Sequence, residues 1–246
     1  MTTLVLTAHG SEDPRSAANA RAVAERVARA RPGLDVRLAF CELNTPSLID
    51  VLTGLPGSAG EAVVSPLLLA DAYHARIDIP GQIAGSGAAG RGLVVLQSRV
   101  LGEDPRLVSV LRHRVLELGV SGLDDRLGVL VAAIGSSDPA ANARTARVAP
   151  KLLAGTRWAG ATTAFVTRPQ PALAEAADLL RRRGARRVVL APWFLAPGRL
   201  PDRVRSFADD AGMALAAPLG AHRLVAETVL DRFDQALRSR ADRIAA

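Results

Sequence analysis

Three side chains that can bind a metal ion or move a proton follow successive strand-like segments of the sequence. His9 comes at the end of TLVLTA, Glu42 ends DVRLAFCE, and His74 lies a few residues past AVVSPLLLA. If these segments are parallel strands, their carboxyl ends meet at one edge of a sheet, where open α/β sheets bind ligands. Two imidazoles and a carboxylate suit a divalent first-row transition ion with open coordination positions. The sequence therefore predicts one metal site formed by His9, Glu42 and His74.

The second half of the chain repeats the first half but lacks these three groups. Four segments match in the same order, at offsets of 118 to 126 residues: HGSEDP with IGSSDP, AFCELNTPSL with AFVTRPQPAL, SPLLLA with APWFLA, and LGEDPRLVSVLRHR with LGAHRLVAETVLDR. This spacing indicates duplication of a unit of roughly 120 residues. Ile134, Thr167 and, close by, Leu200 stand where the first half has its three candidates. Each candidate alone has the alternative of an ordinary loop residue, but three in one copy favour a site.

Both halves alternate short apolar strands with Ala- and Arg-rich amphipathic helices. Strands that are apolar on both faces, separated by helices, are typical of parallel sheets covered on both sides. We expect an α/β protein of two similar domains, an active one over residues 1–120 and a degenerate repeat over 125–246. The polar segment 117–128 is the expected linker. Two such domains in one chain also predict a monomer built like a fused dimer.

The amino-acid composition excludes several classes of protein. Of the 246 residues, 49% are apolar, and this fraction excludes a disordered chain. Only 3% of the residues are aromatic. One cysteine excludes a disulfide framework and a four-cysteine metal site. No apolar run approaches the roughly 18 residues of a membrane span, and the start lacks the basic region of a signal peptide, so we expect a cytoplasmic protein without a membrane partner.

The net charge of +7 lies entirely in the second half. Residues 1–122 hold 12 arginines and 12 acidic residues, whereas residues 123–246 hold 19 basic against 12 acidic residues. A basic excess can attract nucleic acid or a small polyanion. Aromatic side chains for base stacking are scarce and no nucleic-acid-binding motif is present, so we expect no nucleic-acid partner.

Three motifs around the candidate residues resemble a known family. AHGSEDPR, FCELNTPS and PLLLADAYHARIDIP, in this order and at these spacings, look like the sirohydrochlorin chelatases. These are class II tetrapyrrole metal chelatases, and the chain resembles their fused two-domain form. The resemblance implies insertion of Fe(II) or Co(II) into sirohydrochlorin, in siroheme or cobalamin biosynthesis, with the metal as a substrate and no organic cofactor.

The resemblance also assigns roles to residues. It makes His9 and His74 the metal ligands, His9 the proton acceptor, and Glu42 a metal or substrate contact. It implies substrate contacts in the first motif, at Ser11, and in the third, where a segment lies against the macrocycle. That segment comprises Ala70, Asp71, Ala72, Tyr73, His74 and Ala75.

Metal insertion needs groups of this kind. A free-base tetrapyrrole loses two pyrrole N–H protons when it takes up a divalent ion. Neutral imidazole binds such ions and, with a pKa of roughly 6.5 in model peptides, accepts protons near neutral pH. A carboxylate adds charge for the ion and a second base. Coordination must stay partly open, because the site has to release its metal.

Sirohydrochlorin is a polycarboxylate, which gives the arginines a possible role. We expect Arg168, Arg199 and Arg203, at the carboxyl edge of the second sheet, to attract the substrate. Arg15 and Arg76 lie beside the two histidines in sequence and are expected to do the same. Arginine pairs with carboxylates in a bidentate manner better than lysine does. A solvated surface position is the alternative for each arginine.

The sequence also allows a function of another class, that of a binding protein without catalysis. A non-catalytic carrier of tetrapyrrole or metal would use the same residues without turnover. The sequence also leaves the physiological metal open, because the candidate ligands suit several divalent ions.

Overall fold

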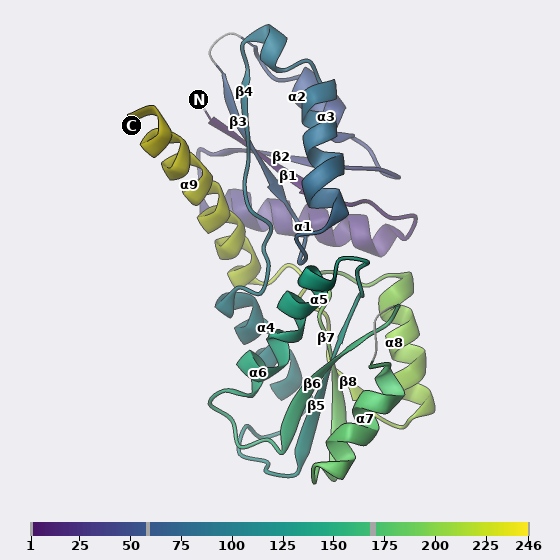
Figure 1. Cartoon of the computed structure of the whole chain (residues 1–246). Coiled ribbons are helices and arrows are strands. Elements are labelled where there is room, and N and C mark those ends of the chain that lie inside the picture. The colour runs from purple at the N-terminus through teal and green to yellow at the C-terminus, as the bar shows by residue number, and fades with distance from the viewer. Residues whose placement is uncertain (1, 58–59, 168–170, 246) are drawn as a thin grey trace. The chain divides into compact units, whose positions relative to one another are not determined.

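The computed structural model describes residues 2–57, 60–167 and 171–245, and it divides into two units (Figure 1). Unit 1 contains Met1–Gly102 and Ala221–Ala246, and unit 2 contains Glu103–Gly220. Each unit has one four-stranded sheet in which all strand pairs are parallel, with helices packed on it. The expected α/β class and the two similar sheets are therefore confirmed.

The sheet of unit 1 has the strand order β2-β1-β3-β4. Its strands are β1 (Thr2–Ala8), β2 (Asp35–Phe40), β3 (Glu61–Pro66) and β4 (Val94–Gln97). The chain moves from β1 to one neighbour and then crosses back to start β3 on the other side of β1. The carboxyl ends of β1 and β3 therefore flank the point where the strand order reverses, which is where open α/β sheets bind ligands.

Helices cover both faces of this sheet. α1 (Pro14–Ala30) and α9 (Arg223–Ala245) pack together, and α2 (Leu48–Thr53) packs with α3 (Ile79–Gly85). α1 begins at Asp13, whose side chain accepts a hydrogen bond from the backbone of Arg15, with Pro14 in the first turn. The α2–α3 side of the sheet encloses a buried cluster of Val5, Ala39, Leu48, Leu52, Leu55, Ala62, Val64, Ile79, Ala88 and Leu93.

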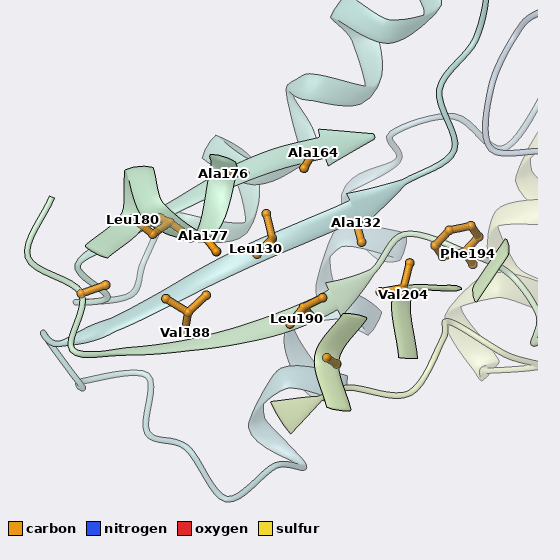
Figure 2. Close-up of a cluster of buried hydrophobic side chains, with 12 residues drawn as sticks. Leu130, Ala132, Ala164, Ala176, Ala177, Leu180, Val188, Leu190, Phe194 and Val204 are labelled. Carbon is orange, nitrogen blue, oxygen red and sulfur yellow. The ribbon is translucent and has the colours of Figure 1, made fainter. Parts of the chain in front are cut away.

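Unit 2 repeats this arrangement, with the strand order β6-β5-β7-β8. Its strands are β5 (Leu127–Ala133), β6 (Gly160–Phe165), β7 (Arg187–Pro192) and β8 (Ala214–Leu215). Its helices are α4 (Pro105–Leu116), α5 (Pro139–Ala146), α6 (Val148–Leu153), α7 (Leu173–Arg182) and α8 (Arg199–Asp210). Figure 2 shows the buried cluster between this sheet and α7 and α8, where Leu130 and Leu190 from adjacent strands meet Leu180 and Val204.

The boundaries of the two units differ from those expected, which placed the end of the first domain at residue 120 and the start of the second at residue 125. The helix expected to close the first domain, α4, packs on α6 and β7 of unit 2, where Leu107 and Leu111 are fully buried. Conversely, α9 follows the second sheet in sequence and packs on α1, β3 and β4 of unit 1. The chain passes from one unit to the other after Gly102 and after Gly220, the two glycines of the repeated Leu-Gly pair, and both have positive φ. The expected linker 117–128 instead connects α4 to β5 within unit 2.

Charged side chains fasten α9 to unit 1. Arg31, at the end of α1, donates from both terminal nitrogens to the carboxylate of Asp234, at 2.6 and 2.8 Å. Arg232 donates to the carbonyls of Val100 and Leu101 at 3.1 and 3.0 Å. α9 is 23 residues long and strongly charged, and none of the helices described is long and apolar enough to cross a membrane.

We expect Asp234→Asn to lower the free energy of unfolding by about 1 kcal/mol at pH 7, because a pair that is about one third exposed is partly screened by solvent. The hydrogen bond from Arg31 holds the pKa of the Asp234 carboxyl below its usual range. The carboxylate therefore stabilises the fold above its unfolded pKa, and this contribution is lost as the pH falls through the lower folded pKa.

Urea unfolding at several pH values measures this difference. The gap between the wild type and Asp234→Asn should stay constant from about pH 8 to about pH 5 and close below about pH 4. Asp178→Asn, which removes an exposed pair with Arg181 on α7, is the matched control and should change little. A gap that persists unchanged in acid would contradict this role of the carboxylate.

Candidate metal site

Backbone pairing between β1 and β2 continues beyond the ends of both strands and places His9 beside Glu42. The amide of Cys41 donates to the carbonyl of Ala8 at 2.9 Å, and the amide of Glu42 donates to the carbonyl of His9 at 3.0 Å. Both side chains therefore leave the backbone at the carboxyl edge of the sheet, as the sequence predicted.

The turn after His9 is pressed against the turn after Glu42. Gly10 has φ +102°, and a Cβ atom there would lie 1.8 Å from the carbonyl oxygen of Glu42, so only glycine fits. The amide of Ser11 donates to Oδ1 of Asn44 at 2.8 Å and joins the two turns again. This close approach restricts the position of His9 relative to Glu42.

His74 opens a short π-helix, η1 (His74–Asp78). Its carbonyl accepts from the amide of Ile79, five residues later, and Gln97 at the end of β4 donates to the carbonyl of Ala75 at 2.6 Å. Turns of this type occur frequently at functional sites, because they change the direction in which a side chain leaves a helix. Here the turn brings the His74 imidazole to His9.

The two imidazoles meet through their Nε2 atoms, which lie 2.7 Å apart. Their ring centroids are 4.0 Å apart with an interplanar angle of 77°. Nδ1 of His74 lies 2.5 Å from Oδ2 of Asp78, and Nδ1 of His9 lies 3.1 Å from the carbonyl of Gly10 and 3.3 Å from Oε1 of Glu42. Oxygen atoms lie beside both Nδ1 atoms, and the Nε2 atoms point toward each other. At 2.7 Å a neutral ring that carries its proton on Nε2 donates a hydrogen bond to the Nε2 of the other ring.

A divalent ion can take the place of this proton. Two imidazole nitrogens that bind one ion at about 2.1 Å and at a right angle lie about 3 Å apart, so a small movement of either ring suffices. The side chains of His9 and His74 are 37% and 40% exposed, which leaves solvent access for an ion. The geometry fits a two-nitrogen site with open positions.

Glu42 does not complete a three-ligand site in this structure. Its carboxylate lies at the Nδ1 side of His9, away from His74. In the described residues, no cluster of three His, Cys, Asp or Glu side chains is arranged to hold an ion. Glu42 is half exposed, so its carboxylate reaches an ion only by rotation of the side chain, and where it stands it orients His9 and adds negative charge.

The other residues expected near the substrate fall into two groups. Tyr73 is exposed beside His74, with the two rings perpendicular and their centroids 6.1 Å apart, and Ala70, Asp71 and Ala72 precede it in an irregular, partly exposed segment. Ala75, by contrast, is buried. The Ser11 hydroxyl accepts from the amide of Asp13, Arg15 pairs with Asp13, and Arg76 pairs with Asp71 at 2.9 Å.

The corresponding edge of unit 2 has different chemistry. Ile134, which replaces the first histidine, is 49% exposed, and the Thr167 hydroxyl accepts from the amide of Gly135 at 3.2 Å. Arg199 and Arg203 are exposed one helical turn apart at the start of α8. Arg168 lies outside the residues that the structure describes.

Sequence reasoning missed Asp78. It lies four residues after His74, and this spacing brings two side chains together on a helical turn, so the spacing itself was the available signal. The Asp78 carboxylate orients His74 in the way that carboxylates orient metal-binding histidines in general.

Cys41, next to Glu42, does not extend the ligand set. Its burial, together with the negative charges of Asp78 and Glu42, raises the pKa of the thiol to about 11. Cys41 therefore remains a neutral thiol at physiological pH. Since cysteine binds metal ions as the thiolate, Cys41 is not a metal ligand there.

Comparisons with known proteins agree with this fold and identify its family. The chain is 29% identical over 209 aligned residues to the sirohydrochlorin ferrochelatase of Priestia megaterium, and the alignment covers 83% of this chain and 77% of that protein. It is 25% identical over 251 aligned residues to the sirohydrochlorin cobaltochelatase of the same organism, and this alignment covers 96% of this chain and 80% of that protein. Among solved structures, SirB from Bacillus subtilis with Fe3+ superposes with a TM-score of 0.82 at 22% identity, covering 98% and 97% of the two chains, which shows a shared fold. The CbiX family profile matches residues 3–118 and, again, residues 128–236, so the chain belongs to the CbiX family.

Proposed function

We propose that this protein is a chelatase that inserts Fe(II) or Co(II) into sirohydrochlorin. The observation that carries the proposal is the pair of opposed Nε2 atoms of His9 and His74 at the carboxyl edge of unit 1. Two relatives named as chelatases of this substrate, one for iron and one for cobalt, support both the reaction and the choice of metals.

In this proposal His9 and His74 hold the incoming ion through Nε2. Two neutral nitrogens bind an ion less tightly than a closed thiolate site, and they leave positions for water and for the pyrrole nitrogens. Such a site can release its metal. Glu42, beside His9, adds a negative charge that favours the divalent ion over the proton it replaces.

The same groups can take up the protons that the reaction releases. Insertion removes two N–H protons from the macrocycle as the ion leaves the histidines. The vacated Nε2 atoms can then share one of these protons at their 2.7 Å separation. The half-exposed Glu42 carboxylate is the second acceptor and can pass its proton to solvent.

Positive charge for the substrate's carboxylates comes, in this proposal, from exposed arginines. Arg199 and Arg203 are exposed at the start of α8, and their proposed role, like that of Arg168, is long-range attraction of the polyanionic substrate. Arg15 and Arg76 pair with Asp13 and Asp71 and follow His9 and His74 in sequence. One chain carries both copies of the repeat, and we propose that it acts as a monomer.

His9→Ala and His74→Ala should each lower kcat/KM for metal insertion by more than about a hundredfold, because each removes one of two metal-binding nitrogens. The measurement is anaerobic insertion of Co(II) into free-base sirohydrochlorin, followed by the absorption of the macrocycle and with circular dichroism as a check on folding. His113→Ala, which removes an exposed histidine of α4 in unit 2, is the matched control and should retain full activity.

The same assay separates a chelatase from a carrier. A carrier would bind sirohydrochlorin or metal in stoichiometric amount and would not accelerate insertion above the spontaneous rate. That outcome for the wild type would overturn the proposed activity. Folded histidine variants with wild-type rates would show that the metal site is elsewhere.

Asp78→Asn should weaken Co(II) binding by about tenfold, since the amide oxygen can still accept from His74 but lacks the charge that strengthens imidazole as a ligand. Asp78→Ala, which removes the acceptor, should weaken it by about a hundredfold. Calorimetric titration of the metal-free protein with Co(II) measures both. Asp71→Asn changes a carboxylate of the same loop that contacts Arg76 and should leave Co(II) affinity unchanged. Equal affinities for the wild type and Asp78→Ala would contradict the orienting role.

A further inference from the structure

Apolar side chains stand exposed around the two histidines. Leu43 follows Glu42 directly and is 62% exposed, and Tyr73 precedes His74 and is 63% exposed. Ile77, in the π-helix of His74, is also exposed. Exposed apolar side chains on both of the segments that carry the histidines can contact an apolar ligand bound there.

Leu43 has a backbone conformation that leucine rarely adopts. Its φ is +62°, and it is the only residue other than glycine with a positive φ in the described parts of the chain. The amide of Asn44 donates to the carbonyl of Glu42 at 2.7 Å, so Leu43 is the central residue of a three-residue γ-turn. Leucine, unlike asparagine or aspartate, has no polar side-chain atom that compensates locally for this conformation.

The γ-turn is held firmly on both sides. Gly10 lies close to the carbonyl of Glu42, the first residue of the turn, and the amide of Ser11 donates to the side chain of Asn44, the last. After it, the amide of Phe40 donates to the carbonyl of Pro46 at 3.0 Å and closes the loop on β2. Leu43 is therefore presented to solvent by an ordered turn.

We propose that Leu43 contacts the face of the tetrapyrrole and helps to hold it over the histidine pair. This inference rests on the proposed function. An ion that passes from His9 and His74 to the centre of a flat macrocycle must cross one of its faces, so that face lies against the Nε2 atoms. The conjugated ring extends well beyond its four nitrogens, and its apolar surface needs apolar partners beside the histidines. Leu43 on one side and Tyr73 on the other supply them.

If the turn had only a local structural role, the side chain at position 43 would not be needed. If the γ-turn served only to place Glu42, glycine at position 43 would serve as well, because glycine adopts positive φ without strain. A leucine at that position is explained by a contact that its side chain makes. Strained conformations of this kind are concentrated at ligand-binding sites.

Leu43→Gly separates the two roles, because it removes the side chain while favouring the observed backbone. We expect its melting temperature to equal or exceed that of the wild type, and its Co(II) affinity to stay within about twofold, since no metal-binding group changes. Its dissociation constant for metal-free sirohydrochlorin, measured by absorption titration, should rise roughly tenfold through the loss of apolar contact.

Two further variants serve as controls. Leu43→Met keeps an apolar side chain of similar size and should retain wild-type affinity. Leu123→Gly, which removes a leucine of similar exposure in unit 2, is the control and should bind sirohydrochlorin as the wild type does.

Each outcome has a defined meaning. If the wild type binds sirohydrochlorin and Leu43→Gly binds it equally well, the contact is wrong and the proposed function stands. If Leu43→Gly melts lower and loses Co(II) and sirohydrochlorin together, the side chain supports the turn and the inference is also wrong. A wild type that binds Co(II) but not sirohydrochlorin overturns the proposed function, and this inference with it.

Discussion

The proposed chemistry depends on two histidine nitrogens that face each other at 2.7 Å. At this distance the two lone pairs repel each other unless a hydrogen atom or a metal ion lies between them. In the proposed reaction, metal release and proton uptake at this point are therefore coupled. The carboxylates of Asp78 and Glu42, each beside the outer nitrogen of one ring, keep the inner nitrogens directed at each other.

The fold supplies this contact from residues that are 65 positions apart. β1 and β3 are adjacent and parallel, and the strand order reverses between them, so the segments after both strands emerge at the same edge. Extra backbone pairing beyond β1 and β2, together with the close approach of Gly10, positions His9. The π-helix positions His74. Unit 2 has the same sheet order, but an exposed isoleucine stands at the position of the first histidine, so the histidine pair and Glu42 belong to unit 1 alone.

Much of this organisation could be predicted from sequence because it depends on local pattern. Strands that are buried on both faces produce continuous apolar runs, and the repeat identified two similar sheets and the copy that carries His9, Glu42 and His74. The exchange of α4 and α9 between the units could not be predicted, because the apolar face of a helix does not indicate which sheet it covers. Nor does residue type reveal that Glu42 stands behind His9 or that Leu43 has positive φ, since both depend on how separate turns pack. Asp78 differs, because its spacing of four residues from His74 was a local signal.

The most direct test of the central claim is anomalous diffraction at the cobalt edge from crystals soaked with Co(II). We expect one strong peak about 2.1 Å from Nε2 of both His9 and His74, and none beside Ile134 at the equivalent edge of unit 2. A peak bound by other residues, with the two Nε2 atoms still in mutual contact, would contradict the proposed metal site.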